Sequence, residues 1–507
     1  MNPRRHLLKA ALAAATAPAL LLGGKATAAA RPADFAAAAA REPLLTPLFG
    51  VNDATGDRDA EARLIGRWPA ALRGRFYRNG PALLERAGQR YHHWFDGDGM
   101  VQQFRIEGGR VVHRGRLVRT AKLAREREAG RFLVDALGTT FPGQAPAAGR
   151  DSFNTANTSA LEHAGRVLAM WEGGSAYAMS PDDLSTQGPV SWRADLAQVP
   201  FSAHPKVDPQ GHLWNIGAAG EQLVVWHVDP AGRLARVQLT GSPFPFGMVH
   251  DMAVTARHLV VPLPPVKLDF ATPAEGSRRR FAMSPGEPLR VLVMDKDDVT
   301  RQRVFELPPR MVFHVSNAHD TADGEVVLGF VAAPDAAFLD EGAVALMAGR
   351  PGVGLGSEPV VARLNMVDGG VRLQPLAGGG AGVEFPRVHP HRVGEAARHV
   401  VFAAAWAHGP RRRHALFHGV QLLDTASGRV RRFDYGADAI AEEHVFVPKP
   451  GGRGELDAWL LGTTFDAKRQ ATVLNLLDAA RIEDGPVAQA VLPYALPLGF
   501  HGNFTAA

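Results

Sequence analysis

The stretch "GFHGNF", residues 499–504, lies three residues before the end of a chain of 507 residues. Chain ends are usually polar and frayed, yet this one carries two aromatic rings, a histidine and two glycines. Two explanations are open. Either the tail is a final strand held in a core, or His501 has a chemical function there.

Short β-type runs separated by turns fill the chain upstream of this stretch, from about residue 60. Regularly spaced short strands indicate a sandwich, a barrel or a propeller. The roughly 475 residues that follow position 30 are too many for one sandwich and favour a propeller of six to eight blades. Two segments look helical, "LARVQL" (234–239) and "TAKLAREREAGRFLV" (120–134). The clearest strand candidates are "GRVLAMWEGG" (165–174), "GHLWNIGAAG" (211–220), "HLVVPLP" (258–264), "LRVLVMDKD" (289–297), "GEVVLGFVAA" (324–333), "ARHVVFAAAW" (397–406), "DAWLLGTTF" (457–465) and "ATVLNLLDA" (471–479).

The composition excludes several kinds of chemistry. The chain has no cysteine, so disulfides, thiolate catalysis and iron–sulfur clusters are ruled out, and a metal has to be held by histidine, carboxylate or water. The net charge of +5 reflects only a small excess of 56 basic over 51 acidic residues. The short basic pieces at 277–281 and 410–414 suit solvated loops better than a surface for nucleic acid or lipid. No Gly-rich nucleotide fingerprint is present.

The N-terminus predicts export. Residues 1–30 have the layout of a secretory signal, with an Ala/Leu-rich stretch and A-x-A sites after Arg4 and Arg5. The pattern R-R-x-L-L-K resembles a twin-arginine signal, which carries folded proteins. The alternative is a frayed alanine-rich arm. We expect residues 31–58 to form a linker or arm, residues 59–507 to form a single propeller domain, and the mature protein to be periplasmic.

Four of the twenty histidines have a distinctive setting. Each follows an apolar or aromatic residue within three positions and lies near a small, polar or turn-forming residue. Each of them would therefore suit the end of a strand that points into a central space, where the blades of a propeller meet. Taken one by one, they are better explained as core histidines bonded to backbone carbonyls. They are His204 in "FSAHPKVDP", His250 in "FGMVHDMAV", His314 in "MVFHVSNAHD" and His501 in "GFHGNF".

Nine segments in order resemble the signatures of the carotenoid cleavage oxygenase family, over nearly the whole chain after the signal. This resemblance implies an all-β, seven-bladed propeller with a dome of loops and helices over its top face. It also implies that the last strand closes the propeller and that His501 ligates iron. The segments are "LRGRFYRNGP" (72–81), "YHHWFDGDGM" (91–100), "NTSALEHAGRVLAMWEGG" (157–174), "FSAHPKVDPQG" (201–211), "MVHDMAVT" (248–255), "FHVSNAHD" (313–320), "EFPRV" (384–388), "EEHVFVPKPG" (442–451) and "GFHGNF" (499–504).

The resemblance implies one Fe(II) per chain, bound by His204, His250, His314 and His501. Four neutral imidazoles would leave two of six octahedral positions open, unlike a two-histidine, one-carboxylate site. In the family, three glutamates hold the outer ring nitrogens of the ligands. By motif these are Glu172, Glu384 and Glu443. The adjacent Glu442 takes the third role if the register is shifted by one residue.

By the same resemblance, the function is cleavage of a carbon–carbon double bond by O₂ to give two carbonyl products, in an apolar tunnel under the dome. The first candidate substrate is a carotenoid or apocarotenoid, and the alternative is a stilbene or phenylpropene. In the stilbene-cleaving branch a Tyr and a Lys bind the substrate phenol. The matching positions are Met100 and Ala124, neither of which forms such a bond, although Lys122 is two residues away.

Two rival functions stay open at this point. One is a binding propeller without chemistry, which the four histidines argue against, and the other is double-bond isomerisation without O₂. The expected partners are a hydrophobic polyene and O₂, with a peripheral membrane contact for substrate uptake. We expect no nucleic acid and infer no protein partner.

Overall fold

All eight strand candidates form strands in the computed structural model, which describes residues 32–141, 145, 148–269, 280–352, 354, 356–376, 382–406 and 416–507. Their residues are rich in Val, Leu and Phe, which suit a pleated surface buried on both faces. The predicted signal and most of the two short basic pieces lie outside the described residues.

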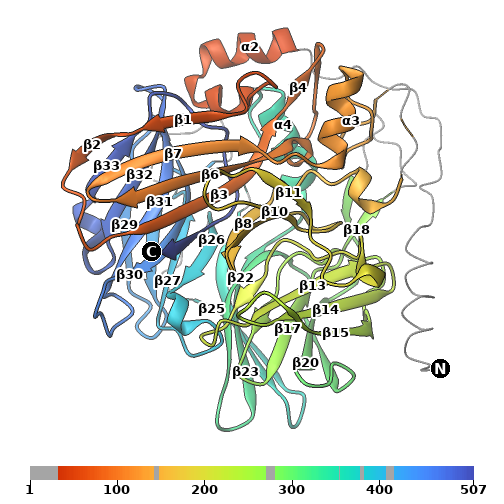
Figure 1. Ribbon diagram of the computed structural model, residues 1–507. Coiled ribbons are helices and arrows are strands. Elements are labelled where there is room, and N and C mark those ends of the chain that lie inside the picture. Colours follow the sequence, from red (N-terminus) through yellow and green to blue (C-terminus); the bar gives the residue numbers. More distant parts are fainter. Residues whose placement is uncertain are drawn as a thin grey trace.

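The described strands form seven sheets of four or five antiparallel strands, which surround a common axis as blades (Figure 1). This confirms the all-β, seven-bladed propeller. In chain order, the first blade contains β1 (Arg58–Glu61), β3 (Gly74–Leu83), β6 (Asp98–Glu107), β7 (Arg110–Leu117) and the C-terminal strand β34 (Gly502–Ala506). The second blade contains β8 (Ser159–His163), β9 (Arg166–Met170), β10 (Tyr177–Met179) and β11 (Thr186–Pro189). The third blade contains β12 (Lys206–Val207), β13 (Leu213–Ala219), β14 (Gln222–Val228) and β15 (Leu234–Gly241).

The remaining four blades continue round the axis, and two short hairpins lie outside the blades. The blades contain β16 (Ala253–Val254), β17 (His258–Leu263), β20 (Leu289–Asp295) and β21 (Gln302–Leu307); β22 (Met311–Asp320), β23 (Glu325–Ala333), β24 (Glu358–Asn365) and β25 (Val371–Pro375); β26 (Val383–Val388), β27 (His399–Ala404), β28 (Gly419–Asp424) and β29 (Val430–Asp434); and β30 (Ala439–Pro448), β31 (Ala458–Asp466), β32 (Ala471–Asp478) and β33 (Pro486–Val491) with β2 (Arg63–Gly66). The hairpins are β4 (Glu85–Arg86) with β5 (Gln89–Arg90), and β18 (Val266–Asp269) with β19 (Arg280–Met283).

The two ends of the described chain close the ring of blades. The C-terminal strand β34 pairs with β3 in the first blade, and β2 pairs with β33 in the last one. At Gly502 a Cβ atom would lie 2.0 Å from the carbonyl oxygen of Tyr77, so only glycine permits this close approach of the two strands. Phe500 is buried in the largest apolar cluster. The unusual tail is therefore a strand held in the core.

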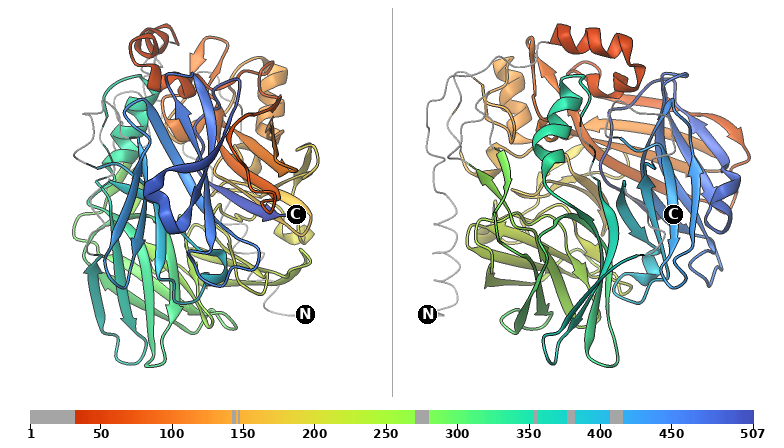
Figure 2. Two further views of the ribbon diagram at one scale, coloured as in Figure 1. Left: turned by 90° about the vertical axis from the view of Figure 1, so that its left-hand side faces the viewer. Right: turned by 180° about the vertical axis from the view of Figure 1, so that it is seen from behind.

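Helices gather on one face of the propeller and form the expected dome (Figure 2). They are α2 (Pro32–Arg41), the 3-10 helix Pro43–Phe49, α3 (Ala121–Ala129), and the π-helix Phe338–Gly342 with α4 (Ala343–Met347). Residues 32–58, expected as a linker or arm, thus begin with a helix that packs on the dome. Its Phe35 is fully buried under the guanidinium of Arg90, 3.6 Å from the ring centroid.

One of the two helical predictions is wrong. The segment 120–134 contains α3, with the Thr120 side chain accepting from the Leu123 amide and Gly130 in a left-handed cap. The segment 234–239 lies instead in β15, where pairing with β14 overrides its weak helical pattern. Among the described residues, none of the helices has both the length and the hydropathy needed to cross a membrane.

Candidate metal centre

The four predicted histidines lie on, or just before, the innermost strands of four different blades. His314 is within β22, while His204, His250 and His501 precede β12, β16 and β34. The innermost strands of a propeller line its axis. Residues that are up to about 300 positions apart in the sequence therefore meet at one place.

The innermost strands are irregular where they carry site residues. The register shifts around His314 in β22, directly after Glu384 in β26, and around Glu442 and Glu443 in β30. A bulge adds a residue to one strand and re-aims its side chains. Phe385, next to Glu384, also has a left-handed φ of 57°, a strained conformation that is typical of functional sites. We infer that these bulges turn the site residues toward the axis.

The four imidazole rings form one compact group. The ring centroid of His204 lies 4.4 Å from that of His250, 5.2 Å from that of His314 and 4.6 Å from that of His501. The Nε2 atoms of His250 and His314 are 3.3 Å apart. Two nitrogen ligands at right angles on one ion, each about 2.1 Å from it, would be about 3 Å apart. The spacing of the rings therefore suits a single metal ion.

Three of the histidines are held through Nδ1 by carboxylates, and these are the three predicted glutamates. Nδ1 lies 3.1 Å from Glu172 in His250, 2.5 Å from Glu384 in His314 and 2.9 Å from Glu443 in His501. This contact fixes the tautomer of each ring, since Nδ1 carries the proton and Nε2 keeps a free lone pair.

The choice between Glu442 and Glu443 is settled by their partners. Glu443 contacts His501 and also accepts hydrogen bonds from the Arg387 guanidinium and the Gly502 amide. Burial opposes the charge of Glu443, but Arg387 and His501 lower its pKa to about 2. Glu442 faces the other way, toward Arg78 and Thr463. Glu443 is therefore the carboxylate behind His501, as the motif predicted.

His204 provides the test of whether a metal fits. Its Nε2 atom is buried and has no hydrogen-bond partner among the described residues. An unpaired buried nitrogen is costly unless something binds it. Burial, and then the neighbouring histidines, hold the pKa of His204 well below its usual value, so its imidazole is neutral at pH 7. A neutral ring with a free lone pair, beside three similar rings, is the donor set of a divalent transition metal.

Two charged residues next to the site were not singled out from the sequence. Asp251 is buried, binds Lys206 at 2.7 Å and accepts from the amide of Val315, so it joins the segment after His250 to β22. Arg387 holds Glu443. The sequence did offer a pattern for each of them. Asp251 is a carboxylate directly after a candidate ligand in "VHDM", and Arg387 is the arginine within "EFPRV". Both residues line a small polar cavity of about 30 Å³ against the histidines, enough for one or two waters.

Aromatic rings enclose the histidines. Phe313 lies 5.4 Å from His250 between ring centroids, and Phe385 lies 5.1 Å from His501. Phe313 and Phe500 belong to a continuous apolar cluster that extends into the dome helices α2 and α4. The metal centre thus lies at the end of an apolar region beneath the dome, while the predicted tunnel through that region stays a prediction.

The phenol-binding argument from the sequence needs a correction. Met100 and Ala124 lie on β6 and α3 as apolar side chains, but a Tyr–Lys pair exists beside them. The ammonium of Lys122 is buried in the dome and lies 2.9 Å from the hydroxyl of Tyr91. It also binds Asp98 and Glu126, each at 2.9 Å. All three donors of Lys122 are thus used within the protein.

The sequence profile of the retinal pigment epithelial membrane protein family matches residues 51–506. The chain belongs to this family, which confirms the resemblance to the carotenoid cleavage oxygenases. It is 28% identical over 461 residues to the apocarotenoid-15,15'-oxygenase of Synechocystis, covering 87% of this chain and 91% of that protein. It is also 28% identical over 472 residues to lignostilbene-alpha,beta-dioxygenase isozyme III of Sphingomonas paucimobilis, covering 87% and 93%.

The fold is shared with solved structures of an apocarotenoid oxygenase and of a lignostilbene dioxygenase. The structure of cobalt-substituted Synechocystis apocarotenoid oxygenase matches with a TM-score of 0.78 at 26% identity, covering 92% of this chain and 99% of that one. Pseudomonas brassicacearum lignostilbene dioxygenase matches with a TM-score of 0.79 at 25% identity, covering 89% and 96%. The chain is thus similar to relatives named for carotenoid-derived substrates and to relatives named for stilbenes.

Proposed function

We propose that the protein is an iron(II) dioxygenase that cleaves a carbon–carbon double bond of a hydrophobic conjugated substrate. The observation that supports this most directly is the buried group of four histidines, three with carboxylates at Nδ1 and the fourth with an unpaired Nε2. One iron ion, bound by His204, His250, His314 and His501, supplies the activation of O₂. Both oxygen atoms of O₂ enter the products, one in each carbonyl group.

The residues of this chain have three tasks in such a reaction. The four imidazoles hold the metal without adding charge, and Glu172, Glu384 and Glu443 hold the rings in one orientation. The aromatic rings around the site exclude water and give the conjugated chain an apolar surface to lie against. The dome would position one double bond next to the four histidines, which is a matter of proximity rather than of acid–base catalysis.

The first candidate substrate is a carotenoid or apocarotenoid. Because Lys122 already binds Tyr91, Asp98 and Glu126, a phenol arriving at this place has no free ammonium donor. A buried phenol without a partner costs roughly 1–3 kcal/mol, which an apolar polyene avoids. The large apolar cluster beneath the dome supports the same choice.

The second candidate is a hydroxystilbene or a related phenolic alkene. It is favoured by the Tyr91–Lys122 pair itself, because the resemblance assigns a Tyr and a Lys to phenol binding in the stilbene-cleaving branch. The Oδ2 atom of Asp98 is buried without a partner among the described residues, so the charges around Lys122 are not fully compensated. A substrate hydroxyl could complete this group after a small rearrangement.

Aerobic incubation of the iron-loaded protein with an apocarotenal, a carotenoid and a hydroxystilbene tests the proposal. We expect bleaching of a polyene and, under ¹⁸O₂, one labelled oxygen in each carbonyl product. If hydroxystilbenes were cleaved at least as efficiently as every polyene tested, the first candidate would be wrong. Lys122→Met should then lower kcat/KM about tenfold more for the hydroxystilbene than for a polyene. An isomerised product without oxygen uptake would contradict the dioxygenase proposal itself.

A further inference from the structure

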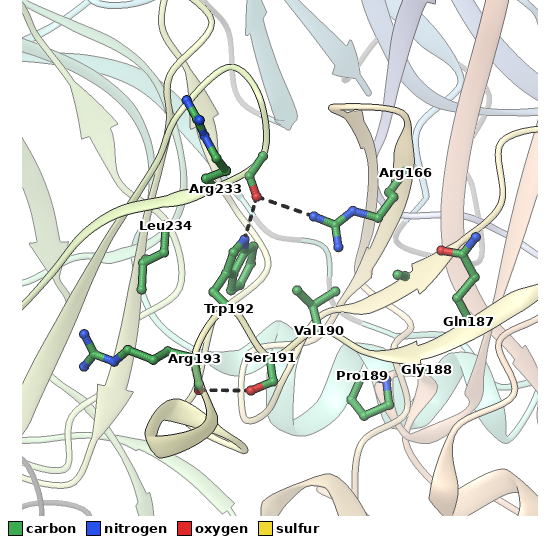
Figure 3. A pocket seen from close by; sticks show the side chains of 12 residues that line it. Arg166, Gln187, Gly188, Pro189, Val190, Ser191, Trp192, Arg193, Arg233 and Leu234 are labelled. Atoms are coloured by element: carbon green, nitrogen blue, oxygen red, sulfur yellow. Dashed lines mark hydrogen bonds between the residues drawn. The ribbon is translucent and has the colours of Figure 1, made fainter.

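A second cavity lies away from the metal centre, between two neighbouring blades. It is a cleft of about 710 Å³ between the blade of β8–β11 and the blade of β12–β15, and it shares no lining residue with the cavity at the histidines. Its volume is in the usual range of small-molecule sites. Figure 3 shows that Arg166, Arg193 and Arg233 line it together with Trp192.

The three arginines differ in how their charge is compensated. Arg193 forms a bidentate salt bridge with Asp195, at 2.6 and 3.1 Å, and Arg233 binds Asp229 at 2.8 Å. Arg166 has no carboxylate within salt-bridge distance among the described residues. Its one hydrogen bond among the described residues is a long one, 3.5 Å from Nη2 to the carbonyl oxygen of Gly232. The cleft therefore holds one uncompensated positive charge.

Trp192 provides an apolar surface on the other side of the cleft. The indole Nε1 of Trp192 donates to the same Gly232 carbonyl at 3.2 Å, so two of the dashed lines in Figure 3 meet at one oxygen atom. The Trp192 ring packs on Phe201, with centroids 4.6 Å apart, and this contact holds it in place. Val190 and Leu234 also line the cleft, and they extend the apolar surface beside the indole.

We propose that this cleft binds a small aromatic carboxylate. The guanidinium of Arg166 is a planar fork that matches a carboxylate, and its donors other than the one at Gly232 have no acceptor among the described residues. Trp192 and its apolar neighbours contact the ring of the ligand. One free positive charge balances a monoanion, whereas a phosphate dianion would keep one negative charge without a partner, because Arg193 and Arg233 are already paired with Asp195 and Asp229. The charge and the apolar wall together select the ligand class.

Calorimetric titration of the full-length protein with sodium benzoate, at fixed ionic strength, tests this site. We expect saturable binding with about one site per chain. Acetate should bind more weakly because it has no ring, and inorganic phosphate more weakly because it has no ring and its second negative charge has no partner in the cleft. Arg166→Gln should weaken benzoate binding about tenfold or more, since it removes a charge-assisted contact. Arg105→Gln is the matched control, because Arg105 is an exposed, ion-paired arginine on β6 outside the cleft.

Three results would overturn the proposal. They are the absence of saturable benzoate binding up to about 10 mM, equal affinity in the wild type and Arg166→Gln, and acetate or phosphate binding as tightly as benzoate. If Arg166→Gln did not fold, Arg166→Lys would replace it. That variant keeps the positive charge but loses the paired, planar N–H donors of the guanidinium, and it should bind benzoate several-fold more weakly. Unchanged binding in Arg166→Lys would likewise count against the assigned role.

Discussion

The carboxylates behind the histidines are held by different contacts, so their removal should have different effects. Glu443 has Arg387 and a backbone amide in addition to His501. Glu384 has the short contact to His314 and the amide of Phe385. Glu172 is only half-buried and accepts weakly from Thr158 at 3.3 Å. Glu384 is therefore the clearest place to test the hold of a carboxylate on a ligand ring.

Glu384→Gln keeps the shape of the side chain but weakens its hold on His314. We expect a loss of about 10–100-fold in activity or metal affinity, measured as initial rates and as iron retained against a chelator. The control is Glu455→Gln, because Glu455 contacts Nδ1 of His399 at 3.2 Å away from the metal centre. Unchanged rates and iron retention in Glu384→Gln would mean that this carboxylate does not orient a ligand.

At the scale of elements, the closing strand β34 depends on Gly502. We expect Gly502→Ala to lower the free energy of unfolding by about 1–3 kcal/mol, because the added Cβ meets the Tyr77 carbonyl and forces β34 and β3 apart. Thermal unfolding measures this change. Gly241→Ala in β15 is the control, since a Cβ there has nothing within 4 Å. Equal melting temperatures for the two variants would contradict the account of the closure.

The sequence predicted strands better than it predicted their irregularities. Runs such as "DAWLLGTTF" are long and apolar enough to be recognised as strands, and β31 is where it was expected. The short run "LARVQL" was mistaken for a helix because pairing, not local pattern, decides its state. The bulge that contains both Glu442 and Glu443 leaves no local pattern, so the choice between them required the structure. The same holds for the Tyr91–Lys122 pair, which joins residues from different elements.

At the scale of the whole molecule, buried neutral histidines should make stability depend on pH. Burial lowers the pKa of His113 to about 3, so the folded state does not take up this proton near pH 5, whereas the unfolded chain does so below its pKa of about 6.5. Its stabilising contribution is therefore present above pH 6.5 and is lost progressively as pH falls from 6.5 toward 3. The free energy of unfolding should fall by up to about 1.4 kcal/mol per pH unit for this group.

His113→Asn removes this titration, and its unfolding free energy should fall less steeply than that of the wild type between pH 6.5 and 5. Chemical denaturation at several pH values measures both slopes. Identical slopes would show that His113 is protonated equally in the folded and unfolded states.

The N-terminal segment concerns the molecule as a whole, because export would determine where the folded protein functions. We propose export through the twin-arginine route, on the pattern that begins with Arg4 and Arg5. Changing both arginines to lysine should leave the enzyme in the cytoplasm, as shown by cell fractionation. The mature protein should begin near residues 29–31. Protein from the native host that still carries Met1 would contradict this proposal.

The central claim is that four histidines bind one iron ion per chain. The most direct measurement is the iron content of the purified, iron-loaded protein and of its His501→Ala variant, with His319→Ala as a control on the strand that also carries His314. We predict about one iron per chain in the wild type and in the control, and a large loss of iron in His501→Ala, because that variant removes one of four ligands. A full complement of iron in His501→Ala would contradict the claim.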